Sequence, residues 1–234
     1  MSADPPLNIF TLPLFPLHCV LFPQFPLRLH IFEERYKVMI NGCIERNEPF
    51  GVVLIREGQE VGAPATPYEV GCVARILAVK RLEDGRMHLL AAGESRFRLL
   101  DYVEADLPYL TGRAEAVEET AYLSGELAPL AQEAGEVFRR YLTLVAERAN
   151  LALPEIELPA DPTLLTFCIA SVAQLPLEDK QRLLEMSDTR LRLQTEIALL
   201  REHSALLEQA EPATVAPLQP DAEFWHHYRH NARN

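Results

Sequence analysis

Lysine is scarce in this 234-residue sequence, which contains only Lys37, Lys80 and Lys180. Mechanisms that depend on a lysine therefore have few candidates. The phosphate-binding motif G-x-x-x-x-G-K-[ST] is missing, as is the G-x-S-x-G motif of serine hydrolases. The nearest approach to the second motif is GESRF around Ser95, which lacks the final glycine and lies between predicted strands. We therefore assign no catalytic residue and expect a protein that is not an enzyme.

Long apolar runs and an excess of basic residues are also missing. No segment reaches the ~18 consecutive apolar residues that a membrane helix requires. No lysine or arginine precedes Arg28, and prolines interrupt the apolar N-terminal region, so we do not expect a secretory signal peptide. Lys and Arg number 22 against 34 Asp and Glu, a formal net charge of −12. Because such a surface repels nucleic acid, we expect a soluble protein that binds neither nucleic acid nor membrane.

The cysteines are far apart and form no C-x-x-C pair that would indicate a zinc knuckle or a redox dithiol. They are Cys19, Cys43, Cys72 and Cys168, and each has apolar neighbours. This pattern is typical of buried free thiols in a reducing cytoplasm, which is the location that we expect. We expect no cofactor and no metal, although the side chains of His226, His227 and His230 are of a type that binds metals.

Residues 1–120 carry the patterns of a β-rich subdomain with one short helix, predicted over 33–46. The runs LRLHI (27–31), FGVVLI (50–55) and VGCVARILAVKRL (70–82) are predicted strands. Asp84 and Gly85 predict a two-residue type I′ turn, after which RMHLLAAG folds back as an antiparallel partner. ESRFRLLDYV and YLTGRAEAVEE follow as two further strands. We expect about six strands, mostly antiparallel, in a twisted or barrel-like sheet.

The apolar period then becomes helical, which predicts a helical bundle over 121–210. Ser124 is a candidate cap for a helix that extends to Arg148, and Asp161 followed by Pro162 predicts the start of the next helix. PLEDKQRLLEM gives a third helix, and the last one is predicted to start near residue 187 or 188. Its apolar seam comprises Leu193, Ile197, Leu200 and Leu207, whereas Arg190, Arg192, Glu196, Arg201, Glu202 and Glu208 are predicted to face water.

Residues 211–234 contain three prolines and are predicted to form an extended arm. Its aromatic residues Phe224, Trp225 and Tyr228 are the expected anchor, either on the same chain or on another copy.

Several motifs in combination resemble the N-terminal substrate-recognition domain of the Lon ATP-dependent protease family. These are PLFP (13–16), LFP (21–23), IFEERY (31–36), VG (70–71), DGR (84–86) and GESRF (93–97), and the resemblance extends over residues 9–208. One departure is Gln24, where the family commonly has glycine. If that glycine needs a positive φ angle, the turn before Pro26 must be built differently here.

The resemblance implies an α+β fold, in which a six-stranded PUA-like pseudo-barrel is followed by a C-terminal helical bundle. It also implies recognition of unfolded or tagged protein segments without catalysis. The family's full-length proteases continue into an ATPase module and a serine–lysine peptidase, and this sequence contains neither. We therefore expect a stand-alone recognition module that works with such segments or with a protease or chaperone partner.

Three functional hypotheses remain open. In the first, some of Phe15, Phe22 and Phe25 are exposed and form an apolar groove for peptides; the alternative is that all three are core or inter-subdomain packing residues. In the second, a cleft between the two subdomains binds a small ligand or substrate, with His18, Arg75, Arg96 and Arg98 as candidate polar groups. In the third, the last helix and the aromatic arm assemble a homo-oligomer, with Trp225 buried at the subunit contact.

Overall fold

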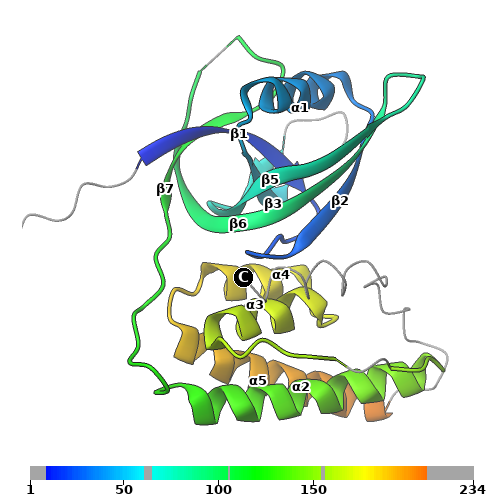
Figure 1. The fold of residues 1–234 in the computed structure, drawn as a ribbon, viewed down its shortest axis with the longest axis vertical. Helices are drawn as coiled ribbons and strands as arrows, with labels where there is room; N and C mark the ends of the chain where they lie inside the picture. Colours follow the sequence, from blue (N-terminus) through cyan, green and yellow to red (C-terminus); the bar gives the residue numbers. More distant parts are fainter. Residues whose placement is uncertain (1–8, 61–64, 105, 154–155, 210–234) are drawn as a thin grey trace, which may run out of the picture. The chain divides into compact units, whose positions relative to one another are not determined.

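A computed structural model describes residues 9–60, 65–104, 106–153 and 156–209 of the chain. The chain divides into two compact units, Met1–Glu118 and Glu119–Asn234, which we call unit 1 and unit 2. Within the described residues, unit 1 contains the strands and one helix, and unit 2 contains four helices (Figure 1). The predicted α+β class is therefore confirmed.

Unit 1 contains seven strands in the part of the chain that the structure describes. They are β1 (Ile9–Leu17), β2 (Pro26–Ile31), β3 (Phe50–Glu57), β4 (Thr66–Pro67), β5 (Val70–Arg81), β6 (Met87–Tyr102) and β7 (Thr111–Ala116), and helix α1 (Glu34–Arg46) follows β2. The expected number was about six. The two-residue strand β4 was not predicted, because it falls in a proline-rich loop. The segments 87–92 and 94–103, predicted as separate strands, instead form the single 16-residue strand β6.

The strands form one sheet in the order β1-β7-β6-β5-β3-β4, and β2 pairs with β6. All these pairings are antiparallel. An additional parallel pairing joins β1 to β3, with Leu14 opposite Gly51 and Leu17 opposite Leu54. The pairings β1-β7-β6-β5-β3-β1 therefore make a closed circuit, and β2 lies outside it.

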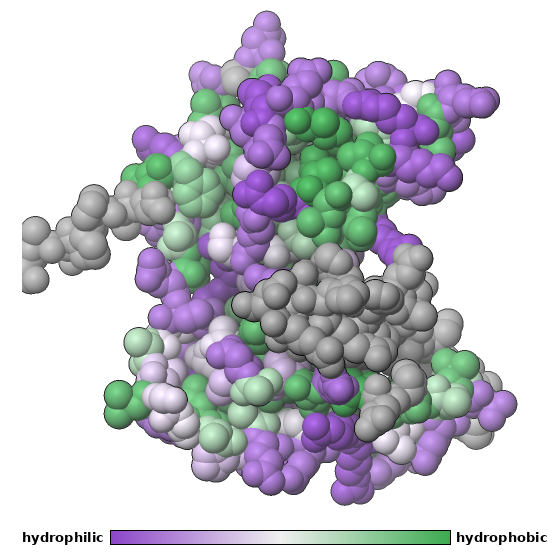
Figure 2. Space-filling view, viewed as in Figure 1, coloured by the Kyte–Doolittle hydropathy of each residue, from purple (hydrophilic) through white to green (hydrophobic). Residues whose placement is uncertain are grey.

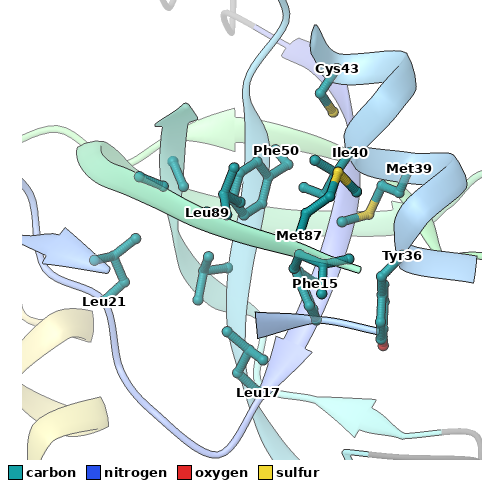
Figure 3. Packing of buried hydrophobic residues seen from close by; sticks show 14 of the residues in the cluster. Phe15, Leu17, Leu21, Tyr36, Met39, Ile40, Cys43, Phe50, Met87 and Leu89 are labelled. Carbon is teal, nitrogen blue, oxygen red and sulfur yellow. The ribbon is translucent and has the colours of Figure 1, made fainter. Parts of the chain in front are cut away.

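The main apolar core of unit 1 lies between the sheet and α1. Tyr36, Met39, Ile40 and Cys43 recur at helical spacing and are buried on one side of α1, as predicted. Figure 3 shows these residues with side chains from the strands, among them Phe15, whose ring stacks on Tyr36 with 4.0 Å between the ring centroids. This contact ties β1 to the helix.

The connection between β5 and β6 differs from the predicted turn. A type I′ turn needs positive φ angles at both central residues. Here Gly85 has a φ of +79°, but Asp84 is not among the residues with positive φ. The amide of Gly85 donates to the carbonyl of Leu82 (3.0 Å), and the amide of Leu82 donates to that of Arg86 (2.9 Å). The loop is thus a turn over residues 82–85 closed by a left-handed glycine, and the Asp84 carboxylate accepts from Arg86.

The turn before β2 keeps a positive φ angle without a glycine. Gln24 has a φ of +68°, so the expectation of a different turn is wrong. Its amide donates to the carbonyl of Gly93 (2.8 Å), whose own amide donates to the carbonyl of Phe25 (3.0 Å). A side chain at Gly93 would collide with the carbonyl oxygen of Phe22. The two hydrogen bonds hold Gln24 in a conformation that costs a non-glycine residue about 1–2 kcal/mol.

Unit 2 comprises α2 (Ala128–Arg148), α3 (Pro162–Val172), α4 (Leu177–Glu185) and α5 (Thr189–Gln209). Helix α5 packs against α2 and α3, which also contact each other. Asp161 caps α3 as predicted, since its carboxylate accepts from the amide of Leu164 at 2.8 Å. Helix α2 begins later than the predicted Ser124, because Gly125 has a φ of +79° and a turn occupies residues 124–127. None of the described helices is long and apolar enough to cross a membrane.

Candidate functional site

Three adjacent strands of unit 1 carry an apolar surface that is only partly covered. On the central strand β6, Ala91 lies between Leu27 of β2 and Ile76 of β5. Leu89 of β6 likewise lies between Leu29 of β2 and Val79 of β5. The central residues on β6 are buried, whereas those on the flanking strands are half-buried and pack against the main core. A register irregularity between Ile76 and Ala78 places Leu77 in a bulge, where 45% of it is exposed.

We call the residues Leu27, Leu29, Ile76, Leu77 and Val79 the apolar sheet surface. Figure 2 shows hydrophobic side chains gathered on unit 1 in the region where Figure 1 draws β5 and β2. Leu77 is exposed and the other four residues are half-buried against the main core, so this surface is open in part. Apolar surface that is open to solvent is characteristic of binding sites for other proteins.

A row of basic side chains crosses the same three strands on the opposite face of the sheet, because its members alternate along the strands with the core-facing residues. His30 on β2, His88 on β6 and Lys80 on β5 form one row across the strands, and all three are exposed. The two imidazole rings are in edge contact with 4.9 Å between their centroids. Arg28 and Arg81 are exposed on β2 and β5. In a chain with a net charge of −12, this region of unit 1 is therefore unusually rich in basic groups.

Strand β2 provides a sheet edge beside the apolar sheet surface. Among the strands in the described ranges it pairs with β6 alone, so its second edge has no strand partner there. Such an edge can form main-chain hydrogen bonds with an extended segment, while alternate side chains contact the surface.

The three phenylalanines predicted as an exposed groove are buried. Phe15, Phe22 and Phe25 have relative exposures of 5%, 0% and 1%. Phe15 packs against Tyr36 and Phe50 in the main core. The three phenylalanines are therefore packing residues, as the alternative interpretation held. The prediction that they form an exposed groove is wrong.

The predicted arginines do not converge. Arg75 forms an exposed ion pair with Glu94, which raises the pKa of the guanidinium through their hydrogen bond. Arg96 is buried on β6, and its carbonyl accepts from Val117. Arg98 is exposed on the same strand, opposite Glu115 of β7. Of the three, only Arg75 lies on the strand segments that carry the apolar sheet surface.

Other predicted residues have different outcomes. The backbone amide of His18 donates to Glu60 at 2.9 Å. The arm residues Phe224, Trp225 and Tyr228, as well as the three histidines near them, lie outside the described residues. Within the described ranges, no group of three His, Cys, Asp or Glu residues could hold a metal ion.

Three of the cysteines are buried free thiols, as predicted. Burial raises the pKa of Cys43 to about 11 and that of Cys168 to about 12, and it also raises the pKa of Cys72. Cys19 is only half-buried, so the prediction holds for it in part.

Unit 2 contains a buried charged cluster that sequence reasoning missed. Arg192 and Glu196 were predicted to face water, but both have a relative exposure of 0%. Arg192 donates to the Thr166 hydroxyl (2.7 Å), the Glu119 carboxylate (3.1 Å) and the Thr189 hydroxyl (3.2 Å). A further bond goes to the carbonyl of Met186, and the guanidinium lies 4.4 Å from the centre of the Phe167 ring. Arg192 thus joins α5 and α3 to the segment that enters unit 2.

Among the residues that the structure describes, neither carboxylate oxygen of Glu196 has a hydrogen-bond partner. Burial raises the pKa of Glu196 well above its ordinary value, and the charge of Arg192 opposes this only in part. The group is therefore held in its neutral form to higher pH than an exposed glutamate. The buried positions of α5 are 189, 192, 193, 196, 197 and 200, which recur at helical spacing. This spacing could have indicated that Arg192 and Glu196 are buried, but the predicted apolar seam included only leucines and an isoleucine.

Comparison with known proteins places the chain in a family. A family model described as "ATP-dependent protease La (LON) substrate-binding domain" matches residues 11–202. The chain therefore belongs to this family, as its motifs indicated.

The curated relatives are full proteases. The chain is 29% identical over 200 residues to a Lon protease from Anaeromyxobacter dehalogenans, an alignment that covers 84% of this chain and 24% of the relative. It is 37% identical over 143 residues to Lon protease 1 from Thermus thermophilus, covering 59% of this chain and 18% of the relative. The chain thus spans about a quarter or less of the length of these relatives.

Two solved structures resemble the fold. A Lon N-terminal domain protein from Xanthomonas campestris has a TM-score of 0.61 and 27% identity, covering 81% of this chain and 98% of that one. The N-terminal domain of a Mycobacterium avium complex Lon protease has a TM-score of 0.62, covering 83% of this chain and 100% of that one. At 18% identity the second shows likeness of fold alone.

Proposed function

We propose that this chain is a non-catalytic recognition module, which binds extended or unfolded protein segments through the apolar sheet surface of unit 1. Membership of the Lon substrate-binding domain family carries the proposal. The chemistry of the surface supports it, since the five residues of the apolar sheet surface are apolar and only partly buried.

The edge of β2 explains why the segment would be extended. A folded protein has already paired its own strands, whereas an unfolded chain has free amide and carbonyl groups for a new pairing. In such a pairing every second side chain would point towards Leu27 and Leu29. Backbone pairing is independent of sequence, which suits a module that accepts many substrates.

We further propose the detailed architecture that the resemblance implied. The closed circuit of β1, β7, β6, β5 and β3 with β2 alongside supports a PUA-like pseudo-barrel within residues 1–120. The packing of α5 on α2 and α3 supports a helical bundle within 121–210. Residues 211–234 would form the arm. The bound segments would be handed to a protease or chaperone partner.

Fluorescence anisotropy tests the proposal. A labelled protein that is reduced and alkylated so that it cannot refold is titrated with the full chain, and the native form of the same labelled protein is the matched control. We expect saturable binding of the unfolded form only, with the label intact on a gel. Equal binding of both forms, or no binding, would contradict recognition of unfolded segments. Fragments formed without ATP would contradict a non-catalytic role.

A further inference from the structure

We propose that His30 and His88 form a binding site for a divalent transition-metal ion, such as zinc, on the outer face of the sheet of unit 1. The two residues lie directly opposite each other on the antiparallel strands β2 and β6, and both are exposed. Neutral imidazole is the commonest metal ligand in proteins and suits zinc, copper and nickel. The site is separate from the apolar sheet surface and does not depend on the proposed function.

The strand register holds the two histidines together on one face. Directly opposite residues of an antiparallel pair have Cβ atoms about 4.5–5.5 Å apart and point to the same side of the sheet. The neighbours of His30 and His88 along the strands, Leu29 and Leu89, belong to the main core of unit 1. Both imidazoles therefore point away from that core, and main-chain hydrogen bonds fix the spacing of the backbone beneath them.

The spacing of the two rings matches that of two imidazoles on one metal ion. Two imidazoles bound to one tetrahedral zinc ion through bonds of about 2.0–2.1 Å have ring centroids about 5 Å apart. The centroids of His30 and His88 are 4.9 Å apart, and the rings meet edge to face at 67°. The ring of His30 also stacks on Phe32 with 5.9 Å between centroids, which limits its motion. Metal binding therefore needs rotation of the rings and no movement of the strands.

Water would complete the coordination of the ion. Among the described residues no group of three His, Cys, Asp or Glu side chains could hold a metal, so the protein supplies two ligands here. Such a site binds more weakly than a structural zinc site with four protein ligands. Lys80 of β5 lies opposite His88 on the other side, and its positive charge opposes binding of a cation. Lys80→Gln should therefore tighten binding about twofold.

A bound ion would connect β2 to the rest of the sheet. Among the described strands β2 pairs with β6 alone, and it lies outside the closed circuit. An ion held by one histidine from each strand adds a cross-link near the end of β2. Because the unfolded chain does not hold the two imidazoles together, the ion binds the folded state preferentially and raises the Tm as its concentration increases.

Isothermal titration calorimetry with zinc chloride tests the site in the full chain. Every protein carries asparagine in place of the three histidines 226, 227 and 230, because these would bind zinc independently of the sheet. We expect one zinc ion per chain. The second imidazole binds within the same molecule, so His30→Asn and His88→Asn should each weaken binding at least about tenfold. His18→Asn, which removes another exposed histidine of unit 1, is the matched control and should leave the affinity unchanged.

Thermal unfolding with and without zinc chloride gives a second readout. The rise in Tm that zinc causes should disappear in His30→Asn and in His88→Asn and persist in His18→Asn. Loss of affinity in only one of the two variants would overturn the shared site, as would an equal loss in the control or no binding at all. One ion per two chains with formation of a dimer would also overturn it, since the ligands would then come from two copies. Substrate takes no part in these measurements, so their failure leaves the proposed function standing.

Discussion

Replacing Arg192 by methionine should strongly destabilise unit 2. The arginine is fully buried and donates hydrogen bonds to groups from residues as far apart in the sequence as Glu119 and Met186. Methionine preserves much of the apolar stem but none of the donors. The Thr166 hydroxyl, the carbonyl of Met186 and the partly exposed carboxylate of Glu119 would each lose this partner.

The size of the effect follows from these contacts. Removing one partner of a buried charged pair typically costs about 3–5 kcal/mol, because the remaining polar groups are left without compensation. For a chain of this size that corresponds to a fall in Tm of about 6–20 °C. Arg190→Met is the matched control on the same helix. Its guanidinium forms an exposed ion pair with Glu126, and such pairs contribute at most about 1 kcal/mol.

Urea unfolding followed by far-ultraviolet circular dichroism measures both variants against the parent. We expect a free energy of unfolding that is at least about 2 kcal/mol lower for Arg192→Met than for Arg190→Met. Equal losses in the two variants would refute it, since the buried network would then contribute no more than a surface ion pair.

Four further substitutions have defined outcomes. Glu196→Gln should gain stability relative to the parent protein between pH 5 and pH 8. The pKa of Glu196 is raised in the folded state, so the parent loses stability as pH rises above the ordinary pKa of about 4.3, whereas glutamine does not titrate. A difference in urea midpoint between variant and parent that does not change with pH would contradict this. Gly93→Ala should destabilise the protein by about 2 kcal/mol or more, because the added methyl group clashes with the carbonyl of Phe22. Gly42→Ala in α1 meets only the flexible end of Arg46 and should stabilise the protein by about 0.5–1 kcal/mol. Changes in Tm of the same sign for both variants would refute this distinction. Gln24→Gly should leave the fold unchanged and raise Tm slightly, because glycine relieves the left-handed strain; a lower Tm would show that the side chain of Gln24 stabilises the turn.

Much of the fold could be predicted from local pattern. The alternation in LRLHI and the helical spacing from Tyr36 to Cys43 identified β2 and α1, because each element has one face on the core. Turn geometry was harder to predict. The residues Asp84 and Gly85 fit a type I′ turn by sequence, but they fit equally well a longer turn that ends in a glycine with positive φ, which is the turn observed. The positive φ angle of Gln24 accompanies hydrogen bonds from its amide to the carbonyl of Gly93 and from the amide of Gly93 to the carbonyl of Phe25, and no local pattern predicts either bond.

The candidate site was less accessible to sequence reasoning. Phe15, Phe22 and Phe25 drew attention because they are large and close together, yet the sheet and α1 bury them. Partial exposure of Ile76 and Leu77 depends on the register of three strands, which no local pattern encodes. Burial of charged residues is likewise a tertiary property, since it depends on partners that lie 26 to 73 positions away in the sequence.

Site-specific photocrosslinking tests the central claim most directly. A photoreactive phenylalanine analogue replaces Leu77 in the apolar sheet surface, Leu107 between β6 and β7 or Leu123 in unit 2, and each full-chain protein is irradiated with the labelled unfolded protein. Leu77 and Leu107 are matched in exposure at 45% and 44%, and Leu123 is more exposed at 81%, so greater accessibility alone would favour adducts at position 123. The account predicts adducts chiefly from position 77, and excess unlabelled unfolded protein should suppress them. Adducts that form equally at all three positions, or chiefly at position 107, would contradict it.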